Sequence, residues 1–437
     1  MLFKAPVSSI SNWKFQFSSN MISKNSIILQ SPNPVQPLIA SFQIKNQSQF
    51  NRFFTKQSTT TNPEEIIQNE QEIIQQATSL LDGTNGQSKD PIKAASLLKK
   101  LADNGSTQAM IMYAGMAENG IGLPTKDIET AGNYYRKAAE QDSSTESCMI
   151  YLQFLRGQKK EADLQSYTKK IVEEGKGSRL FVLALFSLHE GNRNDCEKYL
   201  NLAIDRENVD SMILQASLSI SKDPETSLKL LKRAIDKGSI VAMYGYASYL
   251  AKGEFESIKE NRENEAFSYM KRAADGGLKD ALVTLGEWYL NGFCCVRNVE
   301  KSFEYFKKAA DLFDDPYSQF IYGSFLLSHE KCDKKIGFEY VKKAAQQNLP
   351  DALFKLGFCF MSGDGVNKNE MVANKFFKLA ADSENADSEM LLNYAVRLLV
   401  GEKIKKDENE AAKYLKRGAE SGNKLCIQFL KDLKVKI

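Results

Sequence analysis

Small and apolar residues recur along most of the chain at the spacing of one helix face. From about residue 90 onward, a small residue is followed three positions later by an aromatic residue or leucine, and seven positions later by a second small residue. Residues at these spacings lie on one side of a helix. The rings fill this face, and the small residues let neighbouring helices approach closely. The pattern predicts a tightly packed amphipathic helix.

This helix recurs ten times, at intervals of 31 to 39 residues. The second small position, or its apolar equivalent, is Ala102, Ala139, Val172, Ile204, Ile235, Ala274, Ala310, Ala345, Ala381 and Ala419. A fixed period of this length is typical of solenoids, in which each repeat packs only on its neighbours.

Residues that begin and end helices fall at fixed places in the repeat. An Asp or Asn precedes seven of these helices, where its side chain can cap the first turn: Asp90, Asp127, Asp223, Asn298, Asp333, Asn369 and Asp407. Another amphipathic helix comes before each cap and closes on a glycine in seven copies, namely Gly120, Gly157, Gly191, Gly253, Gly292, Gly363 and Gly401. These glycines predict left-handed turns. Each repeat therefore consists of a first helix, a glycine loop and a capped second helix.

The combined pattern resembles the Sel-one-like repeat (SLR), a relative of the tetratricopeptide repeat, over roughly residues 90–422. Units 109–142, 281–313 and 352–384 match it best, whereas those between 146 and 238 lack the Gly-x-Gly loop. The resemblance implies an all-α, right-handed superhelical αα-solenoid of about ten helix pairs. It also implies a protein that binds other proteins. We expect the solenoid to span residues 63–437, with a capping helix at each end and a solvated charged insertion at Glu254–Glu265.

Residues 1–62 have a different composition and are expected to be a disordered basic leader. Residues 1–63 contain six Lys or Arg and no Asp or Glu. Apolar residues recur at helical spacing from Phe3 to Met21, and the start of the chain resembles a mitochondrial transit peptide. We therefore expect a mitochondrial location. The alternative is a polar tail on a cytoplasmic protein.

Charge and chemistry exclude several classes of function. The whole chain carries +3, so the residues after the leader carry about −3 and offer no basic field for nucleic acid. The longest apolar run, Leu180–Phe186, is too short to span a membrane. The chain has two histidines, His189 and His329, and seven cysteines without metal-binding spacing. No nucleophile, phosphate-loop or zinc-protease motif is present, so we expect no catalysis, cofactor or metal.

Two surface patterns remain as candidates for partner binding. Basic pairs such as Lys307-Lys308 precede the closing small residues of eight second helices. They form either a ridge for an acidic partner or solvated side chains near the negative end of each helix dipole. Tyr249, Trp288 and Phe325 share one position in three consecutive first helices. We expect them to contact a peptide or helix in a concave groove; the alternative is ordinary packing on the preceding helix.

These observations predict a protein-protein interaction scaffold or adaptor. The leading hypothesis is a role in a mitochondrial complex or in its assembly. The alternative is a cytosolic SLR adaptor in signalling or protein quality control.

Overall fold

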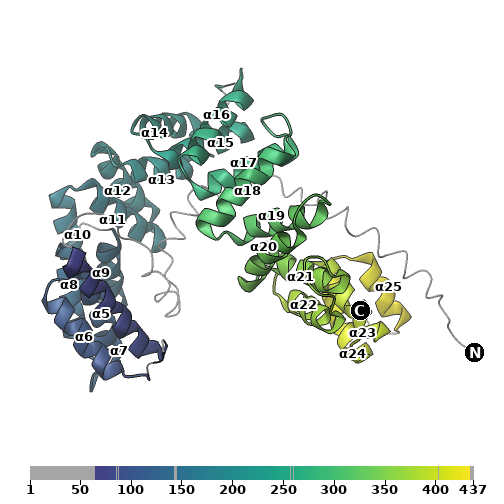
Figure 1. Ribbon diagram of the computed structural model, residues 1–437. Helices are drawn as coiled ribbons and strands as arrows, with labels where there is room; N and C mark the ends of the chain where they lie inside the picture. The colour runs from purple at the N-terminus through teal and green to yellow at the C-terminus, as the bar shows by residue number, and fades with distance from the viewer. Residues whose placement is uncertain are drawn as a thin grey trace, which may run out of the picture. The chain divides into compact units, whose positions relative to one another are not determined.

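A computed structural model describes residues 64–433, except residues 85, 87, 142–144, 256, 259 and 402. The described residues form 21 α-helices, α5 to α25, and contain no strand (Figure 1). The predicted all-α fold and its number of helices are therefore confirmed. The predicted leader, residues 1–62, lies outside the described residues.

The helices alternate between the two types that the repeat predicts. The first helices of successive repeats are α7 (Thr107–Asn119), α9 (Thr145–Gly157), α11 (Gly177–His189), α13 (Val209–Ser219), α15 (Ile240–Lys252), α17 (Lys279–Asn291), α19 (Pro316–Ser328), α21 (Pro350–Ser362) and α23 (Ser388–Val400). The second helices are α6 (Pro91–Asp103), α8 (Ile128–Gln141), α10 (Glu161–Glu174), α12 (Arg193–Asp205), α14 (Pro224–Asp236), α16 (Arg262–Asp275), α18 (Val299–Phe313), α20 (Lys334–Gln346), α22 (Glu370–Asp382) and α24 (Glu408–Glu420). α5 (Glu64–Asp82) and α25 (Lys424–Asp432) lie at the two ends of the described array.

Packing follows chain order, as expected of a solenoid. First and second helices of one repeat pack together, as α7 does with α8 and α19 with α20. Second helices also pack on the first helix of the next repeat, as α18 does on α19 and α20 on α21. The described helices gather into two compact units that meet between Tyr246 and Ala247, so the boundary falls within α15. None of the described helices is long and apolar enough to cross a membrane.

The small residues of the repeat provide the space into which rings pack. Ala131, Ala138 and Ala139 of α8 are completely buried. In α21, a Cβ atom added to Gly357 would lie 2.6 Å from the ring of Phe377 on α22, and Phe377 is itself completely buried. The glycine of the first helix is therefore a slot for an aromatic residue of the second.

All seven predicted caps are confirmed as hydrogen bonds to the first turn of a second helix. The acceptor side chains and the backbone N–H groups that donate to them are Asp90 with Lys93, Asp127 with Thr130, Asp223 with Thr226, Asn298 with Lys301, Asp333 with Lys335, Asn369 with Val372 and Asp407 with Glu410, at 2.8 to 3.1 Å. Each second helix that begins at one of these residues therefore starts where the sequence predicts.

The two glycines of the Gly-x-Gly loop have different tasks. Gly363 ends α21 in the left-handed region, at φ 84°. Gly365, at φ 73°, lies so close to the preceding second helix that an added Cβ would overlap the carbonyl oxygen of Lys334. Two other repeats place a non-glycine residue at this second position, Cys294 at φ 55° and Lys403 at φ 54°.

Two predictions about loops need correction. Gly157 does not form a left-handed turn, because α9 continues through it and Lys159 takes the positive φ of 54° instead. The segment Glu254–Glu265 is not wholly solvated, since Phe255 is only 1% exposed and its ring packs against Tyr249. The segment therefore combines exposed charged residues with one buried ring, that of Phe255.

Candidate functional site

The three aromatic residues predicted to bind a partner lie at the same position of α15, α17 and α19. Tyr249 is 5% and Trp288 is 7% exposed, whereas Phe325 is partly buried. Each ring packs against another ring, with centroids 6.3 Å apart for Tyr249 and Phe255, 5.5 Å for Trp288 and Phe293, and 3.6 Å for Phe325 and Phe303. These contacts give the rings a packing role within the second unit. Their contact with a partner stays a prediction.

A row of carboxylates lies along the starts of four successive first helices in the second unit. Asp280 and Asp351 are the second residues of α17 and α21. Asp315 and Asp387 are the N-caps of α19 and α23, accepting hydrogen bonds from the backbone of their first turns. Glu287 lies seven residues after Asp280, on the same face of α17. These five residues are called the acidic row below.

Tyr317 connects the acidic row across two repeats. It is the second residue of α19, and its hydroxyl donates a hydrogen bond to Oε1 of Glu287 at 3.1 Å. Burial, followed by the negative charges of Glu287, Asp351 and Asp315, raises the pKa of Tyr317. The phenol therefore stays protonated and acts as a donor among acceptors.

The acidic row is held at an electrostatic cost. Burial raises the pKa of Asp280, Glu287 and Asp351. The charge of Asp315 raises the pKa of Asp280 further, and the charge of Asp387 does the same for Asp351. Loss of hydration disfavours the ionised form of all three carboxyl groups, and repulsion by a neighbouring carboxylate adds to it for Asp280 and Asp351.

One lysine offsets part of the charge of the acidic row. Lys279 lowers the pKa of Asp280, an effect smaller than that of burial. Its ammonium also lies 3.6 Å from Oδ1 of Asp315. The pKa of Asp280 remains raised in spite of this neighbour, so the compensation is incomplete.

A regular sequence signal marks the acidic row, although the helix pattern does not reveal it. Asp280, Asp315, Asp351 and Asp387 recur at intervals of 35 or 36 residues, which is the length of the repeat. Asp315 and Asp387 are caps, whereas Asp280 and Asp351 lie two positions after the cap, so no single motif position contains all four. The helix boundaries are needed to place these four residues at the starts of successive first helices.

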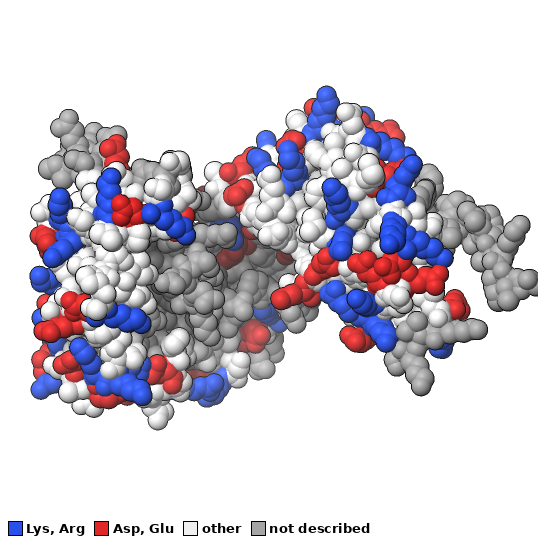
Figure 2. Space-filling model, turned by 90° about the horizontal axis from the view of Figure 1, so that it is seen from below, with Lys and Arg blue, Asp and Glu red and all other residues white. Residues whose placement is uncertain are grey.

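The basic pairs of the second helices contact their own helix or the preceding repeat. The ammonium groups of Lys137, Lys308 and Lys343 lie 5.3 to 5.6 Å from the ring centroids of Tyr134, Tyr305 and Tyr340. Lys170 pairs with Glu140 at 2.7 Å, and Arg417 donates to the carbonyl oxygen of Ala381 at 2.8 Å. Figure 2 shows basic side chains interspersed with acidic ones on the face that it displays. These contacts tie repeats together.

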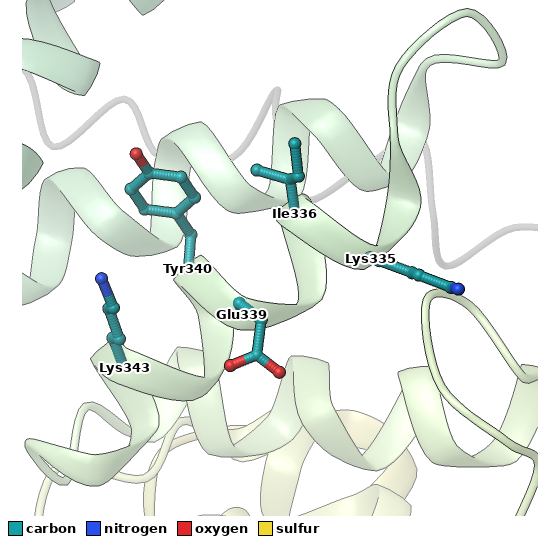
Figure 3. A pocket seen from close by; sticks show the side chains of 5 residues that line it. All are labelled: Lys335, Ile336, Glu339, Tyr340 and Lys343. Atoms are coloured by element: carbon teal, nitrogen blue, oxygen red, sulfur yellow. The ribbon is translucent and has the colours of Figure 1, made fainter.

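A shallow hollow of about 270 Å³ lies on α20 and is lined by Lys335, Ile336, Glu339, Tyr340 and Lys343 (Figure 3). All five residues come from one helix. Ile336 and Tyr340 point to one side of it, and Glu339 points to the other. The hydroxyl of Tyr340 donates to Asp311 at 2.6 Å. The hollow is a surface dent without converging polar groups, so it does not define a catalytic site.

Five of the seven cysteines are buried, and Cys295 and Cys332 are partly buried. Burial raises the pKa of Cys148, Cys196, Cys294 and Cys359 to about 11. A thiol with a raised pKa is a poor nucleophile and a poor metal ligand at neutral pH. Among the residues that the structure describes, no three His, Cys, Asp or Glu side chains lie together as metal ligands.

The alternating helices, with their buried alanines and glycine loops, define a protein of the αα-repeat class. Within that class, the Sel1 repeat matches residues 77–106, 107–143, 210–239, 240–278, 279–312, 316–349, 350–385 and 388–423. The chain therefore belongs to the Sel1 repeat family, as the SLR resemblance predicted. The stretch expected to depart from the repeat is shorter than 146–238, because a match resumes at residue 210.

Individual proteins are similar to this chain in part of its sequence or in fold. The chain is 38% identical over 92 residues to the chitin synthase regulator SKT5 of Saccharomyces cerevisiae, a stretch that covers 21% of this chain and 13% of the regulator. The fold is similar to that of c5321, a protective antigen of uropathogenic Escherichia coli that displays an SLR fold. Here the TM-score is 0.51 at 19% identity, over 83% of this chain and 79% of the antigen. A Sel1 repeat protein from Oxalobacter formigenes gives a TM-score of 0.44 at 20% identity, over 51% of this chain and 89% of that protein.

Proposed function

We propose that this Sel1 repeat protein is a non-catalytic scaffold that holds partner proteins on the first-helix face of residues 247–437. The observation that carries the proposal is the acidic row, which extends over four repeats and is incompletely neutralised. A solenoid that only had to fold would gain stability by replacing Asp280 and Asp351, whose burial disfavours the ionised form, with neutral residues. Their presence supports selection for contact with another molecule.

The role of the three aromatic residues is part of this proposal. The exposed part of Phe325 is best placed to touch a partner directly, whereas the nearly buried Tyr249 and Trp288 would support the surface from below. A rigid aromatic layer beneath a polar face keeps the contact residues in fixed positions.

For the cellular setting we propose a mitochondrial complex or its assembly, on the strength of the acid-free, amphipathic start of the chain. The likeness to a stretch of a chitin synthase regulator supports a second candidate, a cytoplasmic adaptor that regulates or controls the quality of another protein. Both candidates use the same interaction surface.

One experiment tests the scaffold and its location together. The full chain and a variant lacking residues 1–62 are expressed with C-terminal tags, located by microscopy, and purified with their bound proteins. We expect mitochondrial signal for the full chain and loss of it on deletion. Mitochondrial signal that persists without residues 1–62 would contradict the targeting role, and failure of both forms to retain a stoichiometric partner would contradict the scaffold.

A further inference from the structure

We propose that the acidic row binds a Lys- and Arg-rich segment of a partner protein. This inference rests on the proposed scaffold function and adds the chemistry of the partner. It is argued from the charge of the row, from unpartnered hydroxyl groups in the same column of helix positions, and from the exclusion of other cations.

The charge of the row calls for a positively charged occupant. Asp280, Glu287 and Asp351 are partly buried carboxylates whose ionised form is disfavoured in the free protein. A cationic side chain bound beside them would offset their lost hydration, and it would offset the repulsion of Asp280 by Asp315 and of Asp351 by Asp387. Because Tyr317 donates to Glu287, one carboxylate is already held in a fixed position at the centre of the row.

Two buried hydroxyl groups in the same column point to a ligand independently of charge. Ser248 and Ser324 are the ninth residues of α15 and α19, as Glu287 is of α17. Ser248 is 6% exposed, and neither serine hydroxyl has a hydrogen-bond partner among the described residues. A buried hydroxyl without a partner is costly. The ammonium groups and backbone carbonyls of a bound peptide would supply the missing partners after rotation of these short side chains.

Other occupants fit less well. A nucleic acid or an acidic peptide would be repelled by five carboxylates. A metal ion needs several ligands converging on one point, and no such group of three occurs in the described part of the chain. The carboxylates are instead distributed one repeat apart, which matches basic side chains spaced along a peptide.

The test uses the full chain and a fluorescein-labelled peptide of alternating lysine and leucine residues, followed by fluorescence anisotropy. The same peptide with glutamate in place of lysine is the ligand control. We expect the lysine peptide alone to bind, and its affinity to fall as salt is raised. In the variant D280N/D351N we expect binding about tenfold weaker, from two lost charge contacts of the usual size.

The matched control is E304Q/E420Q, which removes two exposed carboxylates from second helices of the same unit. We expect it to bind the lysine peptide as the natural chain does. Equal binding by D280N/D351N and the natural chain, or equal weakening by the control, would overturn the proposal. A lower thermal midpoint for D280N/D351N would also overturn it, because the row would then be stabilising the fold.

The partner proteins distinguish this inference from the scaffold itself. If D280N/D351N retains the proteins that co-purify with the natural chain, the acidic row is not their binding site, and the scaffold function stands. If the natural chain retains no partner, the scaffold function fails whatever the peptide does.

Discussion

The phenol hydroxyl of Tyr414 donates a hydrogen bond to Oδ1 of Asp382 at 2.5 Å, which joins α24 to the end of the preceding second helix, α22. The same contact joins Tyr134 to Asp103 at 2.5 Å and Tyr340 to Asp311 at 2.6 Å. In each case the tyrosine ring also meets a tyrosine of its first helix edge to face, 5.0 to 5.1 Å away. The tyrosine at this position of the second helix therefore links consecutive repeats and also fills space between the helices of one repeat.

Removal of the Tyr414 hydroxyl tests the energy of this link. Tyr414→Phe keeps the ring and its contact with Tyr394 but loses the bond to the Asp382 carboxylate. We expect a loss of about 1.5 to 3 kcal/mol in the free energy of unfolding, the usual size for a hydrogen bond to a charged group. Urea unfolding measures it. Asp382→Ala and the double variant complete a cycle in which the two losses should not add; simple additivity would mean that the bond contributes nothing.

The second glycine of the loop gives a prediction about close packing. Gly365→Ala combines an unfavourable left-handed φ with overlap onto the Lys334 carbonyl, because the loop lies directly on the start of α20. Gly277→Ala in the same unit has a similar φ of 83° but no atom within 4 Å of the added Cβ. The control should lose about 1 to 2 kcal/mol from backbone strain alone.

We expect thermal unfolding to show a clearly larger loss for Gly365→Ala, by several degrees in the midpoint. Equal midpoints for the two variants would mean that the loop can move away from α20 at little cost. The close approach of Gly365 would then be incidental to the fold.

Local rules accounted for most of the fold. The seven Asp and Asn caps and the glycines that end helices act through neighbouring backbone atoms, so their roles are set within one turn. The burial of Phe255 depends on the ring of Tyr249, six residues earlier in α15. The polar composition of the segment around Phe255 gave no indication of this contact. Lys159 replaced Gly157 because the preceding helix extended further, and helix ends are the least certain part of any pattern.

The candidate site was harder to predict than the fold, for a physical reason. Tryptophan is common at interfaces, but its large apolar ring also suits the core of a protein. Only the burial of Trp288 distinguishes these two roles, and the sequence does not give it. Asp280 and Asp351 look like ordinary acidic residues at helix starts. Only the stacking of repeats shows that the charge of Asp280 interacts with that of Asp315, and the charge of Asp351 with that of Asp387.

Replacement of Trp288 separates its packing role from partner contact. The ring is 7% exposed and lies 5.5 Å from Phe293. Trp288→Ala should therefore lower the free energy of unfolding by about 3 to 5 kcal/mol, the range for removal of a large buried ring. Chemical denaturation measures this loss, with the conservative variant Trp288→Phe expected to recover most of it. Unchanged stability with lost partner binding would instead identify Trp288 as a contact residue.

The pH dependence of stability gives the acidic row a signature of its own. Because burial raises the pKa of Asp280, Glu287 and Asp351, the folded protein binds their protons more tightly than the unfolded chain. These three carboxyl groups therefore destabilise the fold above their raised pKa values, and this penalty disappears as the pH falls below the ordinary pKa of a carboxyl group. Carboxylates with lowered pKa, such as the cap Asp223, act in the opposite direction.

We therefore expect D280N/D351N to be more stable than the natural chain at about pH 7, with a difference that shrinks toward about pH 4. Urea midpoints of the two proteins across this range measure the difference directly, and other titrating groups cancel because both proteins share them. Binding of the lysine peptide by the natural chain should weaken over the same range, since protonation removes the charge that attracts it. A stability difference independent of pH would show that these carboxyl groups have ordinary pKa values and are not held at an electrostatic cost.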